Sequence, residues 1–149
     1  MVHGVTTSNG IDWSLDNRLM YYVDTGTSRI DVFDFDVARG DISNRRPLVT
    51  IPDADGKPDG LVVDAEGAIW LALWGGSAVH RYTPDGKLDR TIALPVSHPT
   101  KVAFGGRDLA DLYITSASRP LSADERAREP NAGSLLCCRP GRSEEHTSE

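Results

Sequence analysis

The sequence predicts an all-β fold built from repeated four-stranded antiparallel sheets, which is a partial β-propeller of about three blades. Three segments share one pattern: a small polar residue, a short apolar run, a polar turn and a longer apolar run. They begin at Asn9, Asp59 and Thr100. These starts lie 50 and 41 positions apart, and a propeller blade takes about 40–50 residues. Glycine, proline and aspartate separate the apolar runs, as is typical of all-β chains.

The first repeat predicts three strands. The apolar runs IDW and LMYYV occupy residues 11–13 and 19–23, and residues 29–36 alternate apolar side chains with acids, as a half-exposed strand does. The acidic residues of this region lack the spacing of a calcium-binding loop, so they are interpreted as a solvated strand face. They are Asp31, Asp34, Asp36 and Asp41.

The second repeat predicts four strands. They cover residues 61–63, 68–73, 78–82 and 88–94. The last two are joined by Pro84-Asp85-Gly86, which supplies the backbone angles that a tight reversal needs. His80 lies inside the third of these strands and is expected to point to solvent. Trp13 and Trp70 fall within strand patterns, so we expect them to pack between blades.

The third repeat predicts strands at 102–104 and 112–115, and residues 133–141 are typical of one more strand with its turn. Between them, residues 122–129 form either a short helix or a solvated loop, because Ser122 and Glu125 have the spacing of a capping box. The adjacent Cys137 and Cys138 are interpreted as small buried hydrophobic residues rather than as a disulfide.

Composition excludes several classes of protein. The formal net charge of −6 argues against a general nucleic-acid binder, which needs a basic face. The longest apolar run, residues 68–74, is far shorter than the roughly 20 residues of a membrane-spanning helix. No secretory signal pattern opens the sequence. We therefore expect a cytoplasmic protein that binds neither nucleic acid nor a membrane.

The last eight residues, 142–149, do not continue the repeat. Their sequence, RSEEHTSE, is the string obtained by translating a common sequencing-adaptor oligonucleotide. We expect this tail to be non-native, and it is left out of the fold prediction.

Asn9 and Asp59 occupy equivalent repeat positions, which in a propeller lie at the mouth of the innermost strand. Amide and carboxylate oxygens are hard ligands that suit Ca²⁺, Mg²⁺ or Mn²⁺, and they tolerate Zn²⁺ less specifically. The competing interpretation is that both are turn residues, because Asn-Gly and Asp-Gly are common in hairpins. From the residues alone, the turn is favoured.

Thr100 stands at the same position in the third repeat, where its hydroxyl could bind a substrate or a metal-bound water. His98, two residues earlier, has a side chain that titrates near neutral pH and could shuttle a proton. The alternative for His98 is a solvated loop residue before a proline, which is favoured.

Four segments, taken together and in order, resemble the regucalcin/gluconolactonase family, also called the senescence-marker-protein family. They are residues 8–25, 57–86, 99–117 and 131–136. The resemblance implies a six-bladed β-propeller with one divalent metal ion in its central channel, whose enzymes hydrolyse sugar lactones. Residues 1–141 match the C-terminal half of such a protein. Asn9 and Asp59 match two of the family's metal ligands, whereas the third, a glutamate, has no counterpart here.

The resemblance therefore implies a metal-dependent hydrolase that opens a small-molecule sugar lactone. Its cofactor would be one divalent ion, Ca²⁺, Zn²⁺, Mg²⁺ or Mn²⁺, held by Asn9 and Asp59, and Asp59 would also act as the catalytic general base. Thr100 and His98 are the candidate substrate-binding residues. We expect the fragment to be inactive alone and its parent to be a monomer or weak dimer. The alternative function is a non-catalytic propeller that binds partners or serves as a scaffold.

Overall fold

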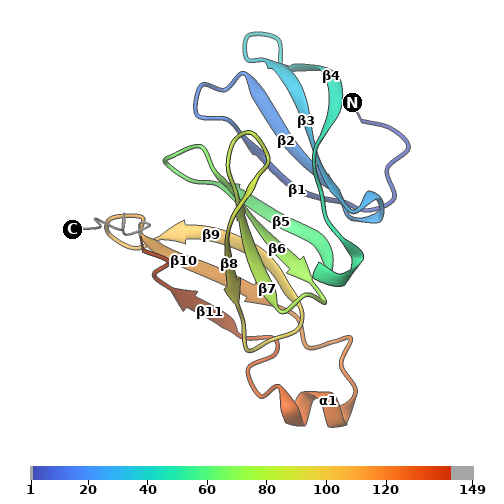
Figure 1. Cartoon of the computed structure of the whole chain (residues 1–149), viewed down its shortest axis with the longest axis vertical. Coiled ribbons are helices and arrows are strands. Elements are labelled where there is room, and N and C mark those ends of the chain that lie inside the picture. Colours follow the sequence, from blue (N-terminus) through green and yellow to red (C-terminus); the bar gives the residue numbers. More distant parts are fainter. Residues whose placement is uncertain (1, 142–149) are drawn as a thin grey trace, which may run out of the picture.

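The computed structural model describes residues 2–141, so the expected non-native tail at 142–149 lies outside the described residues. Within this range the chain forms three antiparallel sheets that follow one another in sequence order. Figure 1 shows the first sheet at one end of the molecule and the second and third beside each other below it. The predicted all-β, blade-like arrangement is confirmed.

The first sheet has the four strands expected of a blade, one of which no apolar run had marked in the sequence. The strands, in order across the sheet, are β1 (Ser8–Trp13), β2 (Leu19–Asp24), β3 (Arg29–Asp36) and β4 (Asp41–Thr50). That unmarked strand is β4, whose side chains are mostly exposed. Because it lies at the outer edge of the sheet, its residues need no apolar alternation, and it tolerates a proline at position 47.

The second and third sheets follow the same plan. The second has the order β5 (Lys57–Val63), β6 (Ile69–Trp74), β7 (Ala78–Tyr82) and β8 (Leu88–Ala93). The third contains β9 (Pro99–Gly105), β10 (Asp111–Ser116) and β11 (Leu135–Cys138). In the described residues this sheet therefore has three strands, where four were expected.

Two apolar layers hold the three sheets face to face. Tyr21 and Ile30 of the first sheet pack with Leu61 and Leu71 of the second, and all four are at most 2% exposed. The opposite face of the second sheet, which includes the predicted interblade residue Trp70, packs against the third sheet. This stacking places the first strand of each sheet, β1, β5 and β9, next to one another.

Short segments connect these strands. η1 (Thr25–Thr27) follows β2, and η2 (Asp53–Asp55) precedes β5. For residues 122–129 the sequence allowed a short helix or a loop, and the structure has a helix there, α1 (Ala123–Arg128). Its capping box is present, since the Glu125 amide donates to Ser122 Oγ at 3.3 Å and the Ser122 amide donates to Glu125 Oε2 at 2.7 Å.

Three predictions about exposure are wrong. His80 is 6% exposed, and its Nδ1 lies 2.9 Å from the Tyr82 hydroxyl. It lies on β7 between Ala78 and Tyr82, which pack in one apolar cluster with residues of the first sheet. Asp31 is 1% exposed rather than solvated, and Arg29 and Arg45 each place Nε 2.6 Å from its carboxylate. Cys137 is exposed, because it lies on the outer face of the third sheet.

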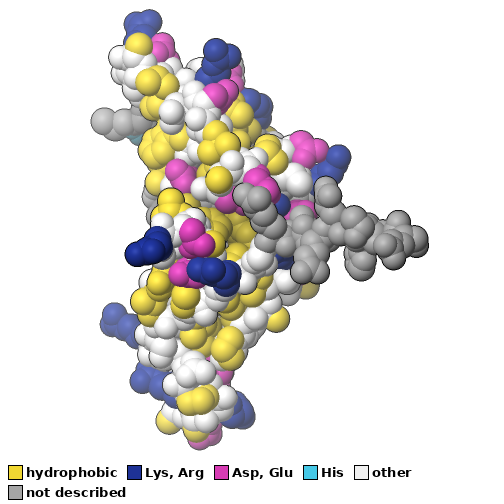
Figure 2. Space-filling model, turned by 90° about the vertical axis from the view of Figure 1, so that its left-hand side faces the viewer, with side chains coloured by type: hydrophobic (Ala, Val, Ile, Leu, Met, Phe, Trp, Pro, Cys, Tyr) yellow, Lys and Arg dark blue, Asp and Glu magenta, His cyan; other side chains and the backbone are white. Residues whose placement is uncertain are grey.

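No helix among residues 2–141 is long and apolar enough to cross a membrane. Figure 2 shows one face of the molecule, on which charged side chains of both signs lie among hydrophobic ones.

Candidate functional site

Asn9 on β1 and Asp59 on β5 are neighbours, because these two strands lie unusually close together. A Cβ atom added to Gly10 would lie 2.6 Å from the backbone oxygen of Asp59 and 2.7 Å from the backbone nitrogen of Leu61. Only a residue without a side chain fits there. The Asn-Gly and Asp-Gly pairs are therefore strand residues at a close approach of two blades, not hairpin turns.

This close approach yields a testable prediction. Gly10→Ala is expected to lower the free energy of unfolding by about 1–3 kcal/mol, because the added methyl group meets backbone atoms that cannot rotate away. Urea denaturation of the variant and of the unmodified chain measures the difference. An unchanged denaturation midpoint would contradict the tight packing of β1 on β5.

The Asp59 carboxyl is half-buried, and this environment makes it easier to protonate. Burial raises the pKa of Asp59 from 3.8 to about 6. A hydrogen bond from the Asn9 side chain, one from the Gly60 backbone and the charge of Lys101 each oppose this rise in pKa without cancelling it. The side chain is therefore mostly ionised at neutral pH and titrates about one pH unit below it.

Thr25, which the sequence analysis did not single out, connects the surroundings of both residues. Its Oγ1 accepts a hydrogen bond from Asn9 Nδ2 at 3.0 Å and donates one to the backbone oxygen of Pro58 at 2.9 Å. Thr25 begins η1, the turn after β2, so it comes from a third segment of the chain. No motif marks it, because a threonine in a polar turn is unremarkable in sequence.

Asp24, just before Thr25, holds this turn in place. It is 2% exposed, and its carboxylate accepts hydrogen bonds from the backbone amides of Thr6 at 3.1 Å, Thr7 at 2.9 Å and Gly26 at 3.1 Å. Burial raises the pKa of Asp24, but the three amide hydrogen bonds outweigh it and bring the pKa below its ordinary value. The ionised side chain therefore joins the segment before β1 to the turn after β2.

Thr100 and His98 differ in how they relate to this pair. The backbone of Thr100 adjoins β5, since a Cβ atom on Gly60 would lie 2.7 Å from the Thr100 oxygen. The Thr100 hydroxyl, however, bonds to the Thr115 hydroxyl at 2.6 Å. The His98 ring packs against Trp74 with 4.6 Å between centroids, and its Nδ1 lies 2.7 Å from Ser97 Oγ. In the described part of the chain, neither of these polar contacts is with Asn9 or Asp59.

The donor atoms at Asn9 and Asp59 fit a hard divalent cation in kind, since one supplies an amide oxygen and the other a carboxylate. Within residues 2–141, no three or more His, Cys, Asp or Glu side chains gather as they would around a metal ion. By themselves, these two side chains would supply only part of a ligand set, and other oxygen donors would have to complete it.

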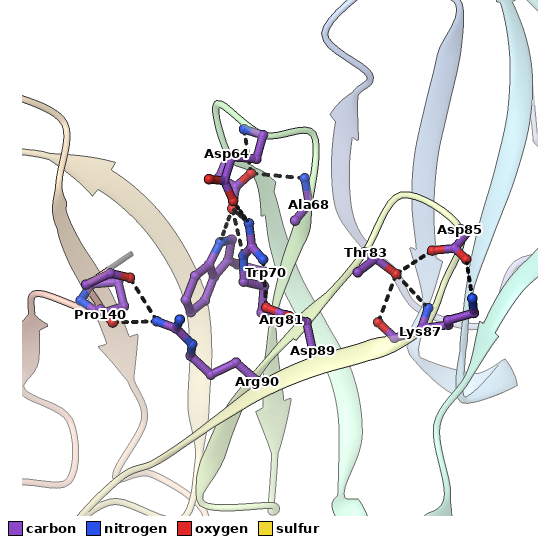
Figure 3. A network of polar contacts seen from close by, with 12 residues as sticks. Asp64, Ala68, Trp70, Arg81, Thr83, Asp85, Lys87, Asp89, Arg90 and Pro140 are labelled. Carbon is purple, nitrogen blue, oxygen red and sulfur yellow. Dashed lines mark hydrogen bonds and ion pairs between the residues drawn. The ribbon is translucent and has the colours of Figure 1, made fainter. Parts of the chain in front are cut away.

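A separate cavity of about 500 Å³ lies between the second and third sheets. Its walls include Trp70, Arg81, Arg90 and Phe104, and none of the predicted site residues lines it. Arg90 bridges it by donating from Nη1 to the backbone oxygens of Pro140 and Gly141 (Figure 3). The arginines in this wall are engaged by the protein itself, so the cavity is not taken as the functional site.

Three antiparallel sheets stacked face to face, with their first strands together, are the arrangement of a β-propeller. Residues 1–118 match the model of the SMP-30/gluconolactonase/LRE-like region. The chain therefore belongs to the SMP-30/gluconolactonase/LRE-like family, and the predicted resemblance is confirmed.

Individual relatives agree with this assignment. YvrE of Bacillus subtilis, provisionally named a sugar lactone lactonase, is 44% identical over 133 residues, which cover 89% of this chain and 46% of YvrE. Regucalcin of Oryctolagus cuniculus is 41% identical over 133 residues, covering 89% of this chain and 44% of the relative. The chain thus spans about half the length of the curated relatives it matches.

Solved structures give the same picture. A calcium-binding regucalcin from Agrobacterium tumefaciens superposes with a TM-score of 0.85 at 33% identity, over 89% of this chain and 45% of that one. A gluconolactonase from Xanthomonas campestris superposes with a TM-score of 0.65 at 29% identity, over 74% of this chain and 35% of that one.

Proposed function

We propose that this chain forms part of a metal-dependent hydrolase that opens sugar lactones. The observation that carries the proposal is the contact between Asn9 and Asp59, which brings an amide and a carboxylate side chain together where the first strands of two blades adjoin. The proposal is supported by the family, whose description includes gluconolactonase, and by the gluconolactonase of similar fold from Xanthomonas campestris.

In this mechanism Asn9 and Asp59 would hold the cation through their side-chain oxygens. A bound divalent cation supplies Lewis acidity, which polarises a lactone carbonyl and makes water more acidic. As the oxygen of the attacking water bonds to the carbonyl carbon, Asp59 would accept a proton from that water. The bond to the ring oxygen would then break, and that oxygen would take up the proton held by Asp59, which leaves a hydroxy acid and the ionised Asp59.

We further propose that residues 1–141 are the C-terminal half of a longer propeller. The support is the coverage of 44–46% of the curated relatives together with the partial ligand set. The remaining ligands and the substrate-binding residues would come from the other half. Thr100, on the third innermost strand, remains a candidate for contact with the substrate, as does His98. The chain by itself would then bind a cation but hydrolyse no lactone.

The test is acid release from gluconolactone by the natural protein that contains residues 1–141, before and after treatment with EDTA. We expect hydrolysis to disappear with the chelator and to return when Ca²⁺, Mg²⁺, Mn²⁺ or Zn²⁺ is added. Hydrolysis that persists in EDTA would rule out the metal. Absence of any hydrolysis, with or without metal, would favour a binding or scaffold propeller.

A further inference from the structure

We propose that Thr25 is a positioning residue of the candidate cation site, whose hydroxyl fixes the Asn9 amide relative to the backbone that carries Asp59. The cation itself rests on the proposed function. The positioning rests only on the hydrogen bonds of Thr25, and can be tested with or without a metal.

The two hydrogen bonds of Thr25 Oγ1 determine which way the Asn9 amide faces. A hydroxyl has one hydrogen and two lone pairs, and the hydrogen points to the Pro58 oxygen at 2.9 Å. The hydroxyl can therefore only accept from Asn9, so the amide nitrogen faces Thr25 at 3.0 Å. Turning the amide over would break this bond and would put two oxygens against each other. The Asn9 carbonyl oxygen is thus held on the side of the amide that faces away from Thr25.

The same hydroxyl also sets the spacing between two blades. Asn9 belongs to the first sheet, whereas Pro58 directly precedes Asp59 in the second. Beside this contact, Lys57 Nζ donates to Ser28 Oγ at 3.0 Å, so the turn touches two successive residues at the start of β5. Movement of Thr25 would therefore shift Asn9 and Asp59 relative to each other.

The turn itself has little freedom to move. The Asp24 carboxylate receives three backbone amides, and the Thr25 amide donates to the Thr7 oxygen at 3.0 Å. These bonds join the turn to the segment that leads into Asn9. An outer residue that orients a metal ligand typically accounts for about 10–100-fold in metal affinity, which is the range expected here.

The experiment compares Thr25→Val, which keeps the shape and removes the hydroxyl, with Thr25→Ser, which keeps the hydroxyl. The matched control is Thr27→Val, which removes a hydroxyl from the same turn. Thr27 Oγ1 donates to the Asp24 oxygen at 2.9 Å. Should Thr25→Val fail to give a dispersed NMR spectrum, Thr25→Ala replaces it. All variants are made in the full 149-residue chain.

The first measurement is the NMR signal of the Asn9 side-chain amide in the metal-free chain. We expect Thr25→Val to shift this signal and to speed the exchange of its protons with water. Thr25→Ser and Thr27→Val should leave both unchanged. The second measurement is Mn²⁺ affinity by calorimetry, which should fall about 10–100-fold in Thr25→Val and stay near the original value in the other two.

The two measurements separate this proposal from the proposed function. If the unmodified chain does not bind Mn²⁺, cation binding by the chain is contradicted, and the Asn9 amide signal still decides the role of Thr25. An unchanged amide signal in Thr25→Val would overturn the positioning role, as would equal changes in Thr25→Ser. A loss of Mn²⁺ affinity in Thr27→Val matching that in Thr25→Val would also overturn it.

Discussion

Asp59→Asn is expected to lower the Mn²⁺ affinity of the chain by about 100-fold or more and to raise the stability of the metal-free chain. The loss of affinity follows from removing the one charged ligand of the pair, since the number of charged ligands largely sets the affinity of such sites. Calorimetry on both chains measures it. The Asn side chain has similar size and keeps an oxygen, so the change isolates the charge.

The gain in stability follows from the raised pKa of Asp59, which is 3.8 in the unfolded chain and about 6 in the folded one. Between about pH 4 and about pH 6 the folded state binds more protons than the unfolded state, so stability falls as the pH rises through this window. Above it, the full shift corresponds to about 3 kcal/mol at most. Solvent that reaches the half-buried carboxylate reduces this cost to about 1–2 kcal/mol.

Urea denaturation in EDTA tests this sign. The stability advantage of Asp59→Asn should be small near pH 4 and should grow to about 1–2 kcal/mol at about pH 7.5. The control is Asp53→Asn, because the hydrogen bond and charge of Lys57 lower the pKa of this exposed carboxyl. Removing it should give no stability gain that grows with pH. If Asp59→Asn is less stable than the unmodified chain at about pH 7.5, the ionised Asp59 carboxylate does not destabilise the metal-free fold.

The inner strands could be predicted from the sequence because burial on both faces leaves a clear apolar signal. Ile69 and Leu71 of β6 face one neighbouring sheet and Trp70 faces the other. Because both faces of β6 are buried, its sequence is continuously hydrophobic. β4 has no such signal, since it is exposed at the edge of its sheet. His80 and Asp31 were misassigned because their burial depends on stacking and on ion pairing with distant residues, which no local pattern contains.

The candidate site divides in a similar way. The repeat predicted that Asn9 and Asp59 take equivalent positions, and stacking of the sheets turns that equivalence into contact. Thr25 could not be found in this way, because it is separated by 16 residues from Asn9 and by 33 from Pro58 and belongs to no repeated motif. Positions in a repeat can be aligned from sequence, whereas a hydroxyl that bridges two repeats appears only when the turn is placed in space.

The second large effect is expected at Arg81, which lies at the centre of an ion-pair cluster in the second sheet. Its guanidinium lies 2.8 Å from Asp64, 2.5 Å from Glu66 and 2.6 Å from Asp89, and its side chain is 12% exposed. It also lies over the Trp70 ring at 5.7 Å, and Trp70 Nε1 donates to Asp64 at 2.8 Å (Figure 3). Arg81→Met keeps the length of the side chain but leaves the shielded Asp64 carboxylate without its cation.

We therefore expect Arg81→Met to lower the free energy of unfolding by about 3 kcal/mol, because a partly buried charge that loses its partner is costly. The matched control is Lys87→Met, in the turn that joins β7 to β8 (Figure 3). Its ion pair with Asp85 at 3.0 Å is exposed on both sides, so water screens it and the denaturation midpoint should barely move. Equal effects of the two substitutions would mean that burial does not distinguish these ion pairs. A double variant, Asp64→Asn with Arg81→Met, removes both charges. If it is clearly more stable than Arg81→Met alone, the loss of stability in the single variant comes from the unpaired Asp64 carboxylate.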